Sequence, residues 1–267
     1  MVSTPIRFLL VLLPLFVMFT NGATAETLDE ILHRGTLRVG MDPAYMPFEF
    51  TNKRGEIIGF DVDVARHMAK AMGVRLELVS TPWDGIIPAL ITNKFDIIIS
   101  GMTLTQERNL RVNYAEPYIV VGQTVLIRAA VGEQVSSYAD LNDPKYKVVS
   151  KLGTTGEIAV KEFLPEAQYI AFEREVDGVM EVVNGNADAF VYDSPYNAVA
   201  NVRYGEGKLL FLDQPFTYEP LAWAVRKGDY NFVNWLDNFL NQIRKDGTYD
   251  RIYHTWFMDS EWLKDLK

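Results

Sequence analysis

The sequence predicts an α/β protein made of two similar units, each a central sheet flanked by helices. Strand and helix signals alternate from residue 36 to residue 108 and again from 147 to 212, which is typical of largely parallel sheets. Two extended, proline-containing crossings near 116–124 and 213–222 join the units. We therefore expect the chain to cross to a second unit and then to return and complete the first.

The elements of the first unit follow from turn and capping signals. They are expected, in chain order, to be a helix over 26–35, a strand over 36–41, a helix over 61–73, a strand over 74–80 and a helix over 84–92. Asp61 is expected to be an N-cap, because a short carboxylate can accept hydrogen bonds from the free N–H groups of a first helical turn. Gly73 is expected to end that helix, since glycine readily adopts the left-handed conformation found there.

The second unit and the C-terminal region follow the same rules. The expected strands are 147–150, 169–171, 187–192 and 208–212, and the expected helices are 174–184, 194–203, 231–245, 249–257 and one opened by Gly153–Gly156. The final helix carries aromatic residues at helical spacing, namely Tyr249, Tyr253, Trp256 and Phe257. Packing against a core is the expected role of such a stripe.

The segment from Asp96 to Arg108 predicts an anion site. Asp96 to Ser100 is a short apolar run expected to form a buried strand, and Thr105 can cap a helix that starts at Gln106. Backbone N–H groups are unpaired at a helix start, and the planar guanidinium of Arg108 matches a carboxylate or a phosphate. An ordinary strand–loop–helix with a surface arginine is the alternative.

The first 25 residues are expected to be a cleaved signal peptide. Arg7 is their only charge, the apolar run from Phe8 to Phe19 is too short to span a membrane, and Ala23-Thr-Ala25 is a small-residue cleavage pattern. We expect cleavage after Ala25 and release of a soluble protein into the periplasm, with no direct membrane insertion. The absence of cysteine excludes disulfides and a lipid-bearing cysteine.

Composition excludes other classes of function. A net charge of −9 without a Lys/Arg cluster argues against nucleic-acid binding. His33, His67 and His254 show no metal-ligand spacing and are expected at the surface. No nucleophile motif is present, so we expect no catalytic residue, no metal and no cofactor. A monomer is the default expectation.

A series of motifs runs along the chain after the signal peptide. They are Leu37–Phe50, Gly59–Asp63, Trp83–Leu90, Asp96–Arg108, Gly153–Glu157, Asp246–Tyr249 and Trp256–Phe257. In order and spacing they resemble the polar amino-acid-binding proteins of ABC importers, extracellular solute-binding protein family 3. The nearest types are the glutamine-binding and the lysine/arginine/ornithine/histidine-binding periplasmic proteins.

This resemblance implies the type II periplasmic-binding-protein fold, with two lobes and a two-strand hinge. The lobes would close around one free L-amino acid and deliver it to an inner-membrane ABC permease complex. On this basis residues 1–25 are the signal peptide, 26–118 and 219–267 form a discontinuous first lobe, and 119–218 form the second lobe.

The residues at the family's ligand positions suit the α-carboxylate and the α-ammonium, which all amino acids share. The carboxylate is expected on Arg108 and Thr103 of the first lobe and on the helix start at Thr154–Thr155 of the second. The ammonium is expected on the Gly101 carbonyl and on Asp193. The alternative for Asp193 is the N-cap of the following helix.

Aromatic and acidic residues are expected around the ligand side chain. Tyr45 and Trp83 stand where the family places aromatic walls, although core packing is the usual role of such residues. Asp42 stands at a position that contacts the side chain in related proteins, and a turn residue before Pro43 is its alternative. Tyr192 either completes the pocket or faces the core.

Lys151 carries the prediction of specificity. The glutamine type has a lysine there, whereas binders of basic amino acids tend to have an apolar residue. A cation in the pocket disfavours lysine, arginine or ornithine as ligand, and Asp42 opposite disfavours a carboxylate side chain. The sequence therefore predicts glutamine, with a basic amino acid as the alternative.

An enzyme of the same fold, cyclohexadienyl dehydratase, is the alternative from another class. That enzyme type has a glutamate general acid three residues after the family aspartate, where this chain has Tyr196. It also has a lysine where this chain has Gln123. Without an acid at Tyr196, proton donation to a leaving hydroxyl has no agent, so no enzyme activity is expected.

Overall fold

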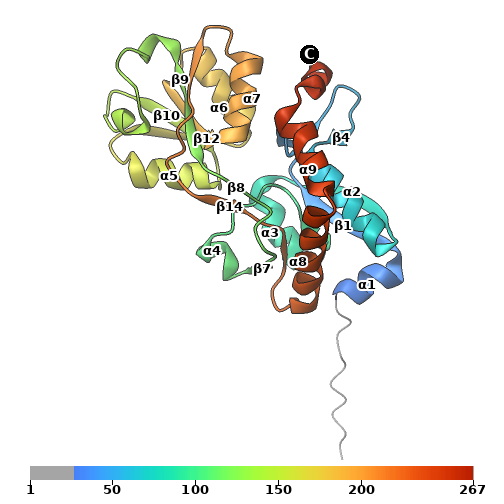
Figure 1. Ribbon diagram of the computed structural model, residues 1–267. Helices are drawn as coiled ribbons and strands as arrows, with labels where there is room; N and C mark the ends of the chain where they lie inside the picture. Colours follow the sequence, from blue (N-terminus) through green and yellow to red (C-terminus); the bar gives the residue numbers. More distant parts are fainter. Residues whose placement is uncertain (1–26, 267) are drawn as a thin grey trace, which may run out of the picture.

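The computed structural model describes residues 27–266, which form two lobes with one five-stranded sheet in each (Figure 1). The predicted signal peptide and its cleavage site lie outside the described residues. The first sheet has the strand order β5-β1-β6-β15-β7 and the second has the order β11-β10-β12-β9-β13. The two-lobe α/β fold predicted from the sequence is confirmed.

The strands of the first sheet are β1 (Thr36–Met41), β5 (Arg75–Ser80), β6 (Ile97–Ile98), β7 (Val112–Tyr114) and β15 (Ala224–Arg226). Those of the second are β9 (Gln123–Arg128), β10 (Lys147–Lys151), β11 (Gln168–Phe172), β12 (Ala189–Asp193) and β13 (Leu209–Leu212). A small separate sheet contains β2 (Ala44–Tyr45), β3 (Glu49–Thr51) and β4 (Ile57–Ile58).

Helices surround both sheets (Figure 1). The first lobe has α1 (Thr27–Arg34), α2 (Phe60–Met72), α3 (Trp83–Ile91), α4 (Gln106–Asn109), α8 (Tyr230–Lys245) and α9 (Thr248–Tyr253). The second lobe has α5 (Thr155–Phe163), α6 (Glu175–Val183) and α7 (Ser194–Tyr204). Each helix of residues 27–266 is too short or too polar to cross a lipid bilayer.

Because the strands pair in parallel, the loops that follow them lie at the same edge of each sheet. β1 pairs in parallel with β5 and β6, and β10 pairs in parallel with β11 and β12. The carboxyl ends of parallel strands meet at one edge of a sheet, and ligands bind beyond that edge in open α/β folds. The loops after these strands therefore position the candidate site.

The chain returns to the first lobe as the sequence predicts. Between the lobes, β8 (Ile119–Val121) and β14 (Glu219–Leu221) run side by side as an antiparallel ladder (Figure 1). β15 then inserts between β6 and β7, with Ala224 opposite Ile98 and Tyr114. The two lobes are thus connected by two neighbouring extended segments.

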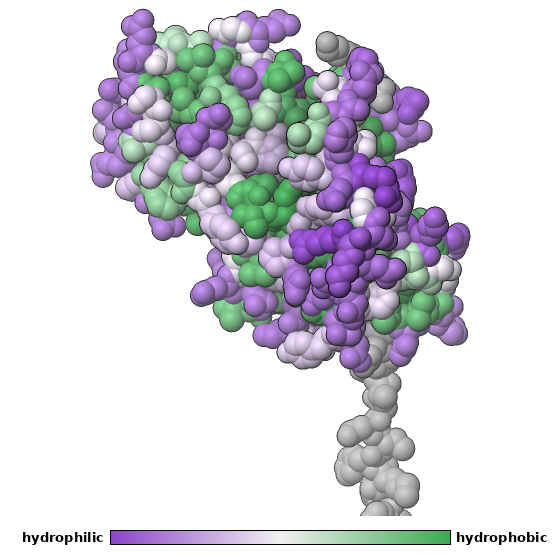
Figure 2. Space-filling model, in the orientation of Figure 1, coloured by the Kyte–Doolittle hydropathy of each residue, from purple (hydrophilic) through white to green (hydrophobic). Residues whose placement is uncertain are grey.

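The C-terminal helices pack on the first lobe. One face of α8 buries Phe232, Leu236 and Leu240, and its opposite face gives a hydrophilic surface (Figure 2). The predicted packing role of the aromatic stripe is confirmed. Trp256 is buried, its Nε1 donates to Asp63 Oδ2 at 2.8 Å, and Tyr249, Tyr253 and Phe257 pack against the same core.

Two local predictions were wrong. Asp61 is not an N-cap, because α2 begins at Phe60 after Gly59; the Asp61 carboxylate is fully buried and accepts the Gly101 N–H at 2.8 Å. The strand predicted from Asp96 is only Ile97–Ile98. Asp96 instead anchors the strand start by accepting the Arg38 backbone N–H at 2.8 Å.

Candidate ligand-binding site

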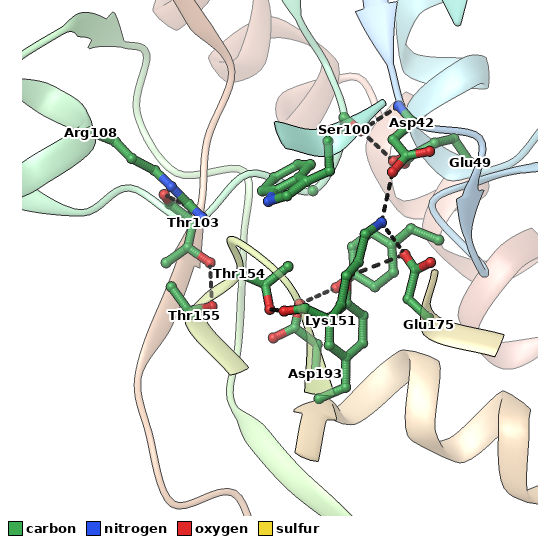
Figure 3. A pocket seen from close by; sticks show the side chains of 14 residues that line it. Asp42, Glu49, Ser100, Thr103, Arg108, Lys151, Thr154, Thr155, Glu175 and Asp193 are labelled. Atoms are coloured by element: carbon green, nitrogen blue, oxygen red, sulfur yellow. Dashed lines mark hydrogen bonds and ion pairs between the residues drawn. The ribbon is translucent and has the colours of Figure 1, made fainter. Parts of the chain in front are cut away.

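A pocket between the lobes brings together all the residues that the sequence predicted for ligand binding (Figure 3). The first lobe contributes Asp42, Tyr45, Trp83, Gly101, Thr103 and Arg108, and the second contributes Lys151, Thr154, Thr155, Tyr192 and Asp193. Glu49, Ser100 and Glu175 line the same pocket and were not predicted. The residues at the family's ligand positions therefore lie together around one pocket, and their roles in ligand binding stay predictions.

One end of the pocket is rich in hydrogen-bond donors. Thr105 accepts the backbone N–H of Arg108 at 3.1 Å and so caps α4 as predicted. The Arg108 guanidinium donates to the carbonyl oxygens of Thr103 at 3.0 Å and, across the cleft, of Gly153 at 3.2 Å. The hydroxyl oxygens of Thr103 and Thr155 lie 3.4 Å apart, so both lobes present hydroxyls here.

Arg108 has carbonyl partners but no carboxylate partner. Within residues 27–266, no acidic side chain lies within 4.0 Å of its guanidinium nitrogens. Burial lowers the pKa of Arg108, yet a guanidinium keeps its charge at neutral pH. A partly buried cation is stabilised by a counter-charge, so this end of the pocket suits an anion such as a carboxylate.

Asp193, at the end of β12, supplies the opposite charge from the second lobe. Its carboxylate accepts the Tyr45 hydroxyl and the Gln123 side-chain amide, each at 2.5 Å. Burial raises the pKa of Asp193 to about 7. Asp193 occupies the N-cap position of α7, as the alternative expected, but its side chain makes no capping hydrogen bond to a backbone N–H group of that helix. A cation placed beside it would favour its charged form.

Gly101 allows the Tyr45 ring to lie close to the backbone after β6. Its φ of +51° is in the left-handed region, and a Cβ atom there would lie 2.2 Å from the Tyr45 ring. Only glycine therefore fits between the turn after β6 and Tyr45. The Gly101 carbonyl as an acceptor for an ammonium stays a prediction.

The structure contradicts the charge argument made for Lys151. Its Nζ lies 2.7 Å from Asp42 Oδ2 and 2.7 Å from Glu175 Oε1, and the residue is 2% exposed. Burial alone would lower the pKa of Lys151, but the carboxylates of Glu175 and Asp42 raise it above its ordinary value. Two carboxylates face one ammonium, so Lys151 presents no uncompensated cation.

Glu49 and Asp61 form a second pair of carboxyl groups beside the pocket. Both are fully buried; Glu49 accepts the Ser100 hydroxyl at 2.6 Å, and Asp61 accepts the Tyr118 hydroxyl at 3.0 Å. Burial raises the pKa of Glu49 well above its ordinary value and that of Asp61 to about 7. The pair therefore keeps a proton near neutral pH and adds less than two negative charges.

Aromatic rings wall the space between these charged groups. Trp83 is the first residue of α3 and donates from Nε1 to the Gly153 carbonyl at 2.9 Å, across the cleft. Its ring lies 5.2 Å from the Arg108 guanidinium and 5.8 Å from Lys151 Nζ. Tyr45 meets Tyr192 edge to face at 5.6 Å, so Tyr192 both lines the pocket and packs.

Glu175 is the most important residue that the sequence analysis missed. It is the first residue of α6 and follows β11, whose carboxyl end lies at the cleft. A carboxylate after such a strand was the available signal. The helix dipole also favours a glutamate at a helix start, so the sequence alone could not distinguish a ligand-binding role from a structural one.

The three histidines and Tyr196 do not line the pocket. His33, His67 and His254 are exposed as expected. Residues 27–266 contain no group of His, Asp and Glu side chains arranged to hold a metal ion. Tyr196 is 1% exposed and packs edge to face on Tyr192 with a ring separation of 5.2 Å.

Comparison with known proteins places the chain in a family. The family model of bacterial extracellular solute-binding proteins, family 3, matches residues 37–259. The chain belongs to this family. The resemblance of its motifs to the polar amino-acid-binding proteins of ABC transporters is thereby confirmed.

Family 3 relatives have the same two-lobe fold. A binding component of an ABC transporter from Wolinella succinogenes DSM 1740, solved with lysine, is 54% identical with a TM-score of 0.84, over 86% of this chain and 99% of that one. An ancestral amino acid-binding protein, a precursor of cyclohexadienyl dehydratase, is 49% identical with a TM-score of 0.80 over the same shares. A probable histidine-binding protein from Neisseria gonorrhoeae is 36% identical over 82% of both chains.

Proposed function

We propose that this protein is the periplasmic binding component of an ABC importer for cationic L-amino acids, with lysine and arginine as the main candidates. The observation that carries the proposal is the contact of Lys151 with two carboxylates, Asp42 and Glu175. This group has a surplus of one negative charge, which favours a ligand whose side chain ends in a cation. The glutamine prediction rested on a free Lys151 cation, and that premise does not hold.

The head groups of the ligand would occupy the other end of the pocket. Arg108 and Thr103 would bind the α-carboxylate together with Thr155, and Asp193 would pair with the α-ammonium. Pairing both charges also rejects molecules that lack either one, because a buried charge without a partner is costly. Tyr45 and Trp83 would enclose the aliphatic part of the side chain.

Relatives support a basic amino acid as the ligand. The binding component from Wolinella succinogenes was solved with lysine, and the Neisseria gonorrhoeae relative is described as a probable histidine-binding protein. Both are described as binding proteins, which supports the non-enzyme role. The ancestral relative is a precursor of a dehydratase, but the buried Tyr196 of this chain offers no acid for that reaction.

Closure of the lobes is the proposed mechanism. The β8–β14 ladder would be the hinge, with lobe boundaries at 118/119 and 218/219. Contacts across the cleft, such as Lys151 with Asp42 and Tyr45 with Asp193, stabilise the closed arrangement. The closed form would be delivered, as a monomer, to the membrane permease.

A thermal-shift panel on refolded mature protein tests this function. The panel contains the twenty L-amino acids, ornithine and prephenate. A ligand at a hundred times its Kd adds about 2.7 kcal/mol of stability, which raises Tm by several degrees. We expect the largest shifts with lysine or arginine and none with prephenate. A shift with glutamine alone would restore the earlier prediction, and a shift with prephenate alone would indicate an enzyme.

Glu175→Gln should separate charge recognition from simple packing. The substitution preserves shape but leaves one carboxylate on Lys151, so affinity for lysine should fall at least about tenfold, or about 1.4 kcal/mol. Affinity for a neutral ligand should change much less. Isothermal titration calorimetry measures both, and Asp177→Asn, which removes a partly exposed carboxylate paired with Arg174 on the same helix, is the matched control. Equal losses for lysine and glutamine would show that Glu175 does not sense ligand charge.

A further inference from the structure

A second cavity adjoins the pocket on its outer side. Its volume is about 480 Å³, whereas the free space in the inner pocket of this closed arrangement is about 10 Å³, or room for about one water molecule. An amino acid can therefore enter the inner pocket only when the lobes move apart. The outer cavity is lined by Asp42, Ala44, Ser80, Pro82, Trp83, Asp84, Leu152, Glu173, Arg174 and Glu175. We call it the outer chamber.

The outer chamber begins where the ligand's side chain would end. Asp42, Trp83 and Glu175 line both the chamber and the inner pocket. The Lys151 ammonium lies between Asp42 and Glu175 (Figure 3), and both of these residues line the chamber as well as the inner pocket. A ligand bound by its head groups at Arg108 and Asp193 would point its side chain toward these shared residues.

The walls of the chamber favour positive charge. Asp84 and Glu173 add exposed carboxylates to those of Asp42 and Glu175. Arg174 is the one cation among the described lining residues, and it donates twice to Asp177, at 2.7 and 2.9 Å. Glu175 is fully buried, and its Oε2 has no hydrogen-bond partner among residues 27–266. The indole of Trp83 adds a surface that attracts cations.

We propose that the outer chamber is an extension subsite for α-amino acids whose cationic side chains are longer or bulkier than that of lysine. This inference rests on the proposed function. Homoarginine and Nε-trimethyllysine are the probes, because they share the head groups of lysine and differ only at the far end. A sealed pocket would reject them strongly, since added atoms in a packed site force side chains out of their rotamers.

The test measures Kd by calorimetry for lysine, homoarginine and Nε-trimethyllysine. With the wild-type protein, both long ligands should bind within about tenfold of lysine. The double variant Asp84→Asn/Glu173→Gln should weaken the long ligands about threefold or more and change lysine less than about twofold. Glu133→Gln/Asp213→Asn is the control, because it removes the same charge from exposed residues that do not line the chamber.

Each outcome decides a separate point. If lysine binds but both long ligands bind more than about a hundredfold more weakly, the pocket is sealed, and the inference is wrong while the proposed function stands. If the chamber variant and the control variant weaken the long ligands equally, the chamber carboxylates take no part, which also overturns the inference. If lysine does not bind in calorimetry and the thermal-shift panel shows no shift with arginine or ornithine, the proposed function itself fails.

Discussion

Replacement of Arg108 by alanine is expected to weaken binding of every L-amino acid by about 3 kcal/mol or more, which is over a hundredfold. Arg108 is the cation at the donor-rich end of the pocket, and it has no carboxylate partner among residues 27–266. Without it, the α-carboxylate of the ligand would be buried against neutral donors alone. Calorimetry with lysine measures the loss.

Two further variants test whether the loss of affinity is due to the Arg108 guanidinium itself. Arg111→Ala removes an exposed arginine three residues away and should leave affinity unchanged. Arg108→Lys keeps the charge but loses the planar pair of donors, so it should recover only part of the affinity. A thermal melt without ligand checks that each variant is folded. A loss below tenfold for Arg108→Ala would exclude Arg108 as the main carboxylate partner.

Affinity for lysine is expected to fall as pH decreases below about 7. Burial raises the pKa of Asp193 to about 7, so the ligand-free carboxyl group is largely protonated in mild acid. The α-ammonium of the ligand favours the charged carboxylate, which means that binding in this range must release the proton. The affinity should therefore fall by up to about tenfold per pH unit, the limit for one linked proton.

Lysine is the right ligand for this measurement because none of its own groups titrates between pH 5 and 8. Asp193→Asn should remove most of the pH dependence and weaken binding at pH 8 by at least about tenfold. Asp61 also has its pKa raised to about 7 by burial, but it does not line the pocket. Asp61→Asn should therefore keep the wild-type slope. If the pH dependence disappears in Asp61→Asn and survives in Asp193→Asn, the proton released on binding comes from Asp61 and this prediction is wrong.

Capping rules, which consider only neighbouring residues, explain why Asp61 was predicted to be an N-cap. Asp61 has the residue type and position of a helix cap, yet it is buried against Gly101 and Tyr118, which are 40 and 57 residues away along the chain. Asp193 occupies the N-cap position of α7, but its carboxylate accepts hydrogen bonds from Tyr45 of the other lobe and from Gln123 instead of from the helix backbone. Capping rules consider only a few neighbouring residues, so they could not reveal these hydrogen-bond partners that are distant along the chain.

The sequence by itself determined the alternation of strands and helices, the return of the chain to its first lobe, and the strand ends that meet in one pocket. These features depend on periodicity, turns and caps, which act over a few residues and are readable in order. Only the tertiary structure decided the charge of that pocket. Lys151 meets Glu175 and Asp42 from separate segments, 24 and 109 residues away, and electrostatic energy depends on distance through space rather than along the chain.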